Sequence, residues 1–513
     1  MQKCFFWLAL VSIFFINHTS SAQKSRKREL RATWIASVVN IDWPSRSGLS
    51  SYQQKQEFVR ILDEHKENGM NAVIVQVRPV ADAFYPSEAE PWSEYLTGEQ
   101  GAIPTPYYNP LAFMIEEAHK RNLEFHAWFN PYRASMKDSL DHISPEHPIK
   151  QHPEWFVKYG PKWYYNPGEP EAREFVLDEI MRVVKHYDLD AVHFDDYFYP
   201  YKIAGEDFPD EDAYQAYCGT FTNKEDWRRY NVDYFVQQLS FRIKKEKPFV
   251  KFGISPFGVW RNQDKDPDGS ATRAGQTNYD DLYADVLKWM REGWIDYVAP
   301  QLYWHIGHPA ADYATLVDWW NKHSYGKHVY IGQGAYRVGK KNWEDPNQLI
   351  DQLMLNETYS NVHGSMFFSS KSLTANPLGV RDSLRNYYQD EALVPMMKWI
   401  DNKPPQSPRI TAVEGSKKDG VIVKWEDSET NDSNYYVVYR FEGDKGGNTE
   451  NAGEMVAKIR RSPYPQQQFT DKEAEVGKKY SYAITAVDRL HCESKSSNQI
   501  AVKHRRWFGI KVL

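Results

Sequence analysis

Two adjacent aspartates, Asp195 and Asp196, end an apolar stretch in the segment LDAVHFDDYFYP, residues 189–200. Burying two carboxylates together costs free energy, because like charges repel and both groups lose hydration. Aromatic side chains follow the acids, and sugars pack their C–H faces on such rings while their hydroxyls bind carboxylates. The segment therefore indicates a carbohydrate site. The alternative is a strand followed by a solvated acidic turn, since an acid-ended strand alone is a weak motif.

Glycoside hydrolysis is the reaction that this pair suggests, because it usually needs one ionised and one protonated carboxyl group beside the bond. We expect Asp195 to be the ionised group, acting as nucleophile or charge stabiliser, and Asp196 is the second choice for either role. Arg78 beside a carboxylate would keep that carboxylate ionised. The general acid stays unassigned, because no acidic residue ends the sixth expected strand. Other acids that could serve are Asp82, Glu88, Asp264, Asp266 and Asp268.

Polar and aromatic side chains also end other expected strands, each set on one face. Side chains alternate along a strand, so residues two apart point the same way. These sets are Gln76 with Arg78; His126, Trp128 and Asn130; His193, Asp195 and Tyr197; and Gln301, Tyr303 and His305, with Asp196 left at the rim. They predict a cup lined with hydrogen-bonding groups and rings. The expected substrate-binding residues are Arg78, Asp82, Trp128, Asn130, His193, Tyr197, Gln301, Tyr303 and Trp304. Among them, Trp128, Tyr197, Tyr303 and Trp304 are the expected sugar platforms, and Arg78, Asn130 and Gln301 would bind hydroxyls or orient a carboxylate.

The elements that must position these residues are apolar strands alternating with helical stretches. The eight expected strands are 30–37, 72–79, 124–130, 191–196, 251–257, 297–304, 328–334 and 363–369. Helical spacing of apolar residues occurs at 52–68, 110–121, 171–186, 231–245 and 279–292. Eight strand–helix units predict a (β/α)8 TIM barrel, whose sites lie at the C-terminal ends of the strands. An open doubly wound sheet is the alternative, but no glycine-rich phosphate loop follows any of these strands.

A second domain follows the segment NKPPQSP, residues 402–408, whose prolines favour an extended linker. Beyond it the pattern is all strand, with an expected buried Trp425 and a strictly alternating segment at 480–487. This pattern resembles a fibronectin type III domain, with Tyr480 in the place of its corner tyrosine. The expected division is a signal peptide at 1–22, a barrel at 27–400, a proline-rich linker at 401–408 and a fibronectin type III-like all-β sandwich at 409–505.

The ends and the composition favour an exported protein. Residues 1–22 combine Lys3, a short apolar run and small residues before Gln23, which is typical of a secretory signal; an uncleaved anchor helix is the alternative. We expect no stable membrane insertion after cleavage, and a periplasmic, cell-surface or secreted location. Cys218 and Cys492 fall in different expected domains, so a disulfide framework is not indicated. The mild net charge of -6 argues against a nucleic-acid partner, whereas aromatics at 15% suit a polysaccharide partner.

Metal and serine chemistry are the rival possibilities. His126, His193 and His305 could converge on a metal, which would suit a metal-dependent polysaccharide deacetylase, but no close-spaced ligand pair such as HxH or HExxH occurs. The segment DKDPDG, residues 264–269, imitates a calcium loop, yet Gly275 stands where its glutamate ligand would be. A serine triad lacks its nucleophile elbow. We therefore expect no metal and no cofactor.

Seven segments, in this order, resemble the bacterial glycosyl hydrolase-like 10 family: WIASVVNIDWP, VIVQVRPVADAFYPS, HAWFNPYR, YYNPGEPEAREFV, HFDDYFYP, ISPFGVWRN and APQLYWHIG. The resemblance covers about residues 29–390. It implies a barrel distantly related to retaining glycosidases and a catalytic aspartate on the fourth strand, which falls on Asp195 or Asp196. It also implies export for many members and, for some, cleavage of peptidoglycan glycan strands.

Together these features predict an exported glycoside hydrolase that cleaves a polysaccharide with carboxylate groups. Peptidoglycan glycan strands are the substrate that the resemblance suggests. The alternative is a non-catalytic glycan-binding barrel, which the missing acid on the sixth strand motivates.

Overall fold

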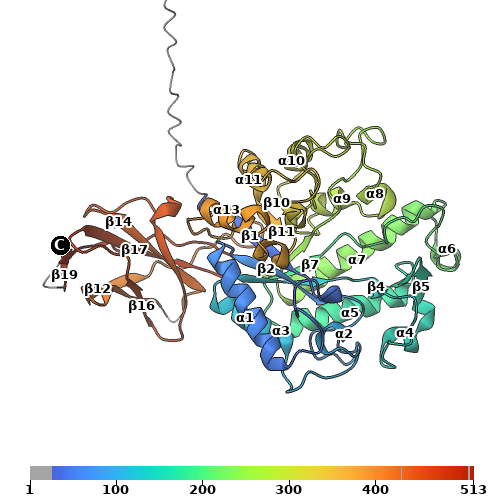
Figure 1. Ribbon diagram of the computed structural model, residues 1–513, viewed down its shortest axis with the longest axis horizontal. Coiled ribbons are helices and arrows are strands. Elements are labelled where there is room, and N and C mark those ends of the chain that lie inside the picture. The colour runs from blue at the N-terminus through green and yellow to red at the C-terminus, as the bar shows by residue number, and fades with distance from the viewer. Residues whose placement is uncertain (1–25, 429, 506–508) are drawn as a thin grey trace, which may run out of the picture.

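A computed structural model of the chain describes residues 26–428, 430–505 and 509–513 (Figure 1). The expected signal peptide at 1–22 lies outside these residues. Within them, no helix has both the length and the apolar character needed to cross a membrane.

Eight parallel strands close into a barrel, in the order β1-β11-β10-β9-β8-β7-β3-β2. The predicted TIM barrel is therefore confirmed. Its strands are β1 (Leu30–Ile35), β2 (Ala72–Arg78), β3 (Glu124–Phe129), β7 (Ala191–Phe194), β8 (Lys251–Ile254), β9 (Tyr297–Val298), β10 (His328–Gln333) and β11 (Val362–Phe367). Several end before the expected residue, so the polar groups after them, Asp195 and Asp196 among them, lie on the loops above the barrel.

Helices surround the barrel and bury their apolar faces against it (Figure 1). The longer ones are α1 (Ser51–Glu67), α3 (Pro110–Lys120), α5 (Pro170–His186), α7 (Lys224–Glu246), α10 (Tyr313–Lys322), α11 (Gln348–Glu357) and α13 (Val380–Tyr387). Shorter ones are α2 (Glu94–Thr97), α4 (Pro148–Gln151), α6 (Glu211–Tyr217) and α12 (Ser370–Thr374). Ser50 and Gln53 begin α1 with a reciprocal capping box.

The single helix expected over 279–292 is wrong. Two short helices take its place, α8 (Asn278–Asp281) and α9 (Val286–Arg291). Tyr283 between them has a φ of 53°, a left-handed conformation that a continuous helix does not permit. The side chain of Asp285 then accepts from the N–H of Lys288 and starts the second helix.

The barrel interior is filled by inward-facing side chains that include Ala32, Trp34, Trp128, Tyr297 and Tyr330. Small residues make room for the large ones. A Cβ atom on Gly253 of β8 would lie 2.0 Å from Cζ of Tyr297, so the tyrosine ring occupies the space that any other residue at 253 would fill. Glycine is therefore required there for packing.

A small antiparallel sheet, β4-β6-β5, projects from the barrel between β3 and α5 and was not expected from the sequence. It consists of β4 (Arg133–Ser135), β5 (Phe156–Tyr159) and β6 (Lys162–Tyr165). Its first residue, Arg133, reaches back over the barrel mouth, as described below.

The C-terminal part forms two antiparallel sheets, ordered β12-β13-β16 and β15-β14-β17-β18-β19, around one apolar cluster. The strands are β12 (Arg409–Ser416), β13 (Gly420–Glu426), β14 (Tyr435–Glu442), β15 (Met455–Arg460), β16 (Gln466–Asp471), β17 (Lys479–Val487), β18 (Ile500–Arg505) and β19 (Gly509–Val512). Trp425 is fully buried, and the Tyr480 hydroxyl accepts from the backbone N–H of Glu475. The sheets are present, while the fibronectin type III relationship stays a prediction. We call residues 409–513 the C-terminal module.

The loop after β17 docks this module on the barrel, at the end opposite the site loops. His491 Nε2 lies 2.6 Å from Glu124 Oε1 at the start of β3. Arg489 donates to the backbone oxygen of Leu189 at 2.8 Å and pairs with Asp190 at 3.3 Å. The interface is therefore built from buried charges as well as apolar contacts.

Candidate functional site

A cavity of about 410 Å³ opens at the C-terminal ends of the barrel strands, where barrel enzymes place their sites. Asp195 and Asp196 both line it. Expected residues that also line it are Trp128, Tyr197, Gln301 and Tyr303. The other lining residues are Trp34, Ala36, Val38, Val39, Ile41, Gln76, Arg133, Met136, Tyr201, Ser255, Tyr336 and Phe368.

Asp195 is a buried carboxylate held by an amide and a guanidinium. Asn130 Nδ2 donates to its Oδ2 at 2.6 Å, and Arg133 lies 3.6 Å from the same oxygen. Burial raises the pKa of Asp195, while Arg133 and Asn130 act in the opposite direction. Its other oxygen, Oδ1, is buried and has no hydrogen-bond partner among the described residues.

Backbone groups fix the direction of the hydrogen bond from Asn130. The N–H groups of Ser37 and Val38 donate to Gln76 Oε1 at 3.0 and 2.8 Å. Gln76 must therefore present its Nε2 to Asn130 Oδ1, 2.5 Å away, and Asn130 must present Nδ2 to Asp195. Because an amide N–H can only donate, the relay favours Asp195 as an ionised acceptor.

Asp196 has a different environment. It accepts a short hydrogen bond from the Tyr201 hydroxyl and another from the side chain of Gln301, and no described cation forms an ion pair with it. Burial, followed by the charge of Asp195, raises the pKa of Asp196 to about 7. The expected rim position is wrong, since Asp196 is only 2% exposed and lies in the cavity wall. The backbone leaves the strand after Phe194, so the two neighbours need not point apart. Burial and the neighbouring charge therefore favour the protonated form of Asp196 over that of Asp195, which lies beside a guanidinium.

Aromatic side chains form the walls around the acids. The Tyr197 and Tyr201 rings stack with centroids 5.2 Å apart, and the Arg133 guanidinium lies 4.9 Å from the Tyr197 centroid. Trp128 lines the cavity with a buried Nε1–H that has no acceptor among the described residues. These rings give the cavity flat apolar surfaces beside the two acids.

Five expected substrate-binding residues do not line the cavity. Arg78 is fully buried and contacts the Glu90 carboxylate at 2.7 Å. It also donates to the backbone oxygen of Asn130, so it positions a loop and does not contact Asp195 or Asp196. Asn130 acts through Asp195. Asp82 is fully buried under the second loop and accepts from Gln100, and burial raises its pKa to about 7.

His193 and Trp304 complete this set. His193 lies beneath the cavity with no exposed surface and bonds Tyr297 and Ser255. Trp304 packs edge-on against Phe257, with centroids 5.5 Å apart. Neither side chain therefore forms part of the cavity wall.

The other acids considered for the reaction lie away from the cavity. Glu88 and Asp264 are exposed, and Asp266 pairs with Arg261 at 2.9 Å in the loop expected to imitate a calcium site. Asp195 and Asp196 are the only acidic residues among the described residues that line the cavity.

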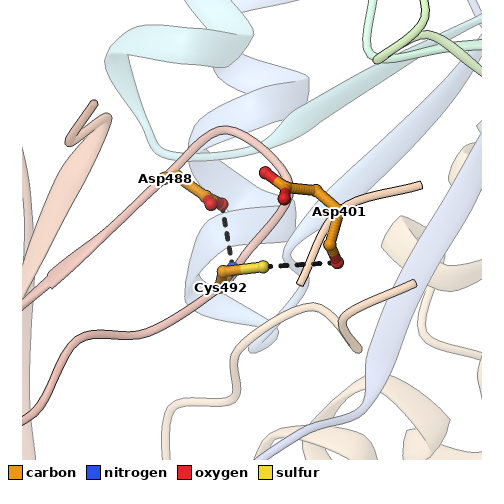
Figure 2. Close-up of side chains that lie close together, drawn as sticks. All are labelled: Asp401, Asp488 and Cys492. Atoms are coloured by element: carbon orange, nitrogen blue, oxygen red, sulfur yellow. Dashed lines mark hydrogen bonds between the residues drawn. The ribbon is translucent and has the colours of Figure 1, made fainter. Parts of the chain in front are cut away.

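The three histidines considered as metal ligands do not converge. His126 and His193 face the same Tyr297 hydroxyl at 2.9 and 3.0 Å, and His305 bonds the backbone oxygen of Ile306. Among the described residues, one group could hold a cation: Asp401, Asp488 and Cys492, at the opposite end of the barrel (Figure 2). There the Cys492 N–H already donates to Asp488, and its thiol to the backbone oxygen of Asp401. This group has no connection with the cavity.

Sequence reasoning missed several cavity residues. Arg133 and Tyr201 contact the acids but belong to β4 and to the loop after β7. Both stand in or beside the motifs HAWFNPYR and HFDDYFYP, which was the available signal. Trp34 lies on the face of β1 that points into the barrel, and Ser255 directly follows β8. Tyr336 follows β10 in a short helical turn, for which no signal existed.

Comparisons with known proteins identify a family and several proteins that this chain resembles. Residues 29–350 match the glycosyl hydrolase-like 10 family. The glycosyl hydrolase YngK of Bacillus subtilis strain 168 is 51% identical over 502 residues, covering 96% of each chain. The glycosyl hydrolase DigH of Escherichia coli strain K12 is 37% identical over 365 residues, covering 66% of this chain and 82% of that protein. The glycoside hydrolase domain of PgaB (BpsB) from Bordetella bronchiseptica superposes with a TM-score of 0.45 at 13% identity, covering 70% of this chain and 98% of that chain.

Proposed function

Because this chain belongs to the glycosyl hydrolase-like 10 family, we propose that it hydrolyses the glycosidic bonds of a polysaccharide at the cavity above its barrel. The observation that carries the proposal is the unequal environment of two neighbouring acids. Asp195 receives an amide donor and lies beside a guanidinium, whereas Asp196 receives only a hydroxyl and an amide. Such a difference assigns the acid and base roles in carboxylate catalysis.

In this reaction Asp196 donates its proton to the glycosidic oxygen as the bond from that oxygen to the anomeric carbon breaks. Asp195 stabilises the positive charge on the anomeric carbon, or attacks that carbon to form a glycosyl ester. Water then adds to the carbon, displacing the Asp195 carboxylate where an ester has formed, and the proton of the water returns to Asp196. Arg133 and Asn130 favour the ionised form of Asp195 before the reaction, so the general acid that the sequence left unassigned is Asp196.

Peptidoglycan glycan strands are the proposed substrate. Aliphatic side chains of Val38, Val39, Ile41 and Met136 share the cavity with the rings. Rings suit the C–H faces of sugars, and aliphatic groups suit the methyl groups of acetamido and lactyl substituents, which these strands carry. Export to the periplasm or cell surface, and a fibronectin type III-like accessory role for the C-terminal module, belong to the same proposal.

Product analysis by mass spectrometry tests it. The protein and its Asp195→Asn and Asp196→Asn variants are incubated with peptide-free glycan strands and with a panel of other polysaccharides. We expect oligosaccharides from the wild type and a loss of at least about a hundredfold in each variant, the size expected for removal of a general acid or a charge stabiliser. Asp345→Asn, on an exposed loop, is the control and should release products at the wild-type rate.

Two results would change the assignment. Binding of glycan strands without any products from the wild type would favour the non-catalytic glycan-binding protein. Products that persist unchanged in both variants would place the chemistry outside the acid pair.

A further inference from the structure

A line of buried hydrogen bonds leads from the cavity down through the barrel. Trp34 and Ser255 line the cavity, and their Nε1 and Oγ atoms lie 3.3 and 2.9 Å from Nε2 of His193. The other ring nitrogen of His193 lies 3.0 Å from the Tyr297 hydroxyl, which lies 2.9 Å from Nδ1 of His126. His126, His193 and Tyr297 are each at most 1% exposed. We call these three residues the axial chain.

Further hydrogen bonds connect the axial chain to the C-terminal module. His126 Nε2 lies 3.0 Å from Oε2 of Glu124, whose Oε1 contacts Lys251 and, at 2.6 Å, Nε2 of His491. His491 Nδ1 in turn lies 3.0 Å from the Tyr435 hydroxyl. The hydrogen bonds therefore run from the cavity wall at one end to the C-terminal module at the other.

The Trp34 indole at one end and the Glu124 carboxylate at the other fix the direction of the bonds in the axial chain. An indole N–H can only donate, so Nε2 of His193 is the acceptor for Trp34 and carries no proton. The proton of the neutral His193 ring is therefore on Nδ1, which donates to the Tyr297 oxygen. Tyr297 must then donate its own proton to Nδ1 of His126, and His126 donates from Nε2 to Glu124.

The charges agree with this direction. Burial lowers the pKa of His193 well below its ordinary value, so the ring is neutral. Burial would raise the pKa of Glu124, but Lys251 and His491 lower it well below its ordinary value, so Glu124 is an ionised acceptor. A fixed anion at one end and a fixed indole donor at the other leave one arrangement of protons.

The structure assigns His193 and Tyr297 as positioning residues of the cavity: Tyr297 holds His193 in the Nδ1-protonated form, whose unprotonated Nε2 accepts from the Trp34 indole and lies 2.9 Å from the Ser255 hydroxyl in the wall. Ser255 also connects to the acids, because Gln301 donates to its backbone oxygen at 2.8 Å and bonds Asp196 with the same side chain. The effect on turnover rests on the proposed function, whereas the proton arrangement does not.

Side-chain nitrogen NMR of isotopically labelled histidines tests the arrangement directly. The His193 signals are identified by their loss in His193→Gln. We expect the full-length wild type to show His193 with a proton on Nδ1 only. A proton on Nε2, or a doubly protonated ring, would overturn the assignment without reference to any substrate.

Two matched variants test the positioning. Tyr297→Phe removes the hydroxyl of the axial chain. Tyr330→Phe removes a neighbouring buried hydroxyl that bonds His328 at 2.9 Å and is not part of the chain. We expect similar losses of thermal midpoint in both, but a fall in kcat/KM of about tenfold in Tyr297→Phe and under about twofold in Tyr330→Phe, since only the former loses an orienting hydrogen bond.

Equal falls in activity for the two variants would reduce Tyr297 to a packing role and overturn the proposal. Should Tyr297→Phe fail to fold, His193→Gln takes its place: its amide oxygen can accept from Trp34, so it should keep more activity than His193→Ala. Absence of turnover in the wild type would contradict the proposed function alone, and the NMR result would still decide the proton arrangement.

Discussion

At the scale of single residues, the raised pKa of Asp196 sets a limit on the pH range of activity. The proposed general acid must carry its proton, and this proton is lost as the pH rises through about 7. We expect kcat/KM on glycan strands to fall on the alkaline side of about pH 7, roughly tenfold per pH unit once ionisation is complete. A pH–rate profile of the wild type checks this. A profile that stays flat to pH 9 would contradict the role of Asp196, because nothing else in the pair could then supply the proton.

The same pKa predicts a change in stability. A group whose pKa is higher in the folded than in the unfolded protein stabilises the fold at low pH, and that contribution is lost as the pH rises through the folded-state value. Asn imitates the neutral acid and does not titrate. Asp196→Asn should therefore have a free energy of unfolding roughly 2–4 kcal/mol above that of the wild type near pH 8, and a similar one near pH 4, where the acid is largely protonated in both the folded and the unfolded protein. Urea titrations at both pH values make the comparison, and a variant less stable at pH 8 would be inconsistent with it.

The sequence was enough to identify the acid pair, but not to show which acid is held ionised and which is protonated. Adjacent aspartates after an apolar strand are visible in one line of letters. What separates Asp195 from Asp196 is the relay through Gln76 and Asn130 and the return of Arg133 from β4. Those contacts depend on the strand register and on the conformation of a loop, and neither produces a periodic pattern in the sequence.

At the scale of elements, the strands were predictable and the connections were not. Apolar runs of the right length, separated by helical spacing, located all eight barrel strands. The β4-β6-β5 sheet escaped because its strands are three or four residues long, too short for an alternating pattern. The break between α8 and α9 escaped because it depends on one backbone conformation at Tyr283.

The packing of strand β9 depends on Gly253 of the neighbouring strand β8, which leaves space for the Tyr297 ring. We expect Gly253→Ala to destabilise the protein by about 1–3 kcal/mol, since the added methyl would meet the Tyr297 ring and force it to move. Urea unfolding measures the loss. Gly275→Ala serves as the control, because Gly275 has open space around its Cβ position. Equal stability of the two variants would show that Tyr297 does not need the space above Gly253.

At the scale of the whole molecule, the polar interface joins the C-terminal module to the barrel. We expect the Arg489→Ala, His491→Ala double variant to lose about 3 kcal/mol or more, because it leaves Glu124 and Asp190 as buried charges with fewer partners. Calorimetry should then show two separate transitions in place of one. Lys479→Ala breaks an exposed pair with Asp444 on the same module and should leave the single transition unchanged. Two transitions already present in the wild type would show that the interface does not couple the parts.

The contact between Glu124 and His491 spans 367 positions of the chain. A ribosome makes the first strands of the barrel long before it makes the residue that completes their lower end. Every strand of the barrel can pair while the loop after β17 is still unmade, yet Glu124 then has only Lys251 and His126 as partners. This end of the barrel therefore gains its full set of contacts only after the loop after β17 has been translated.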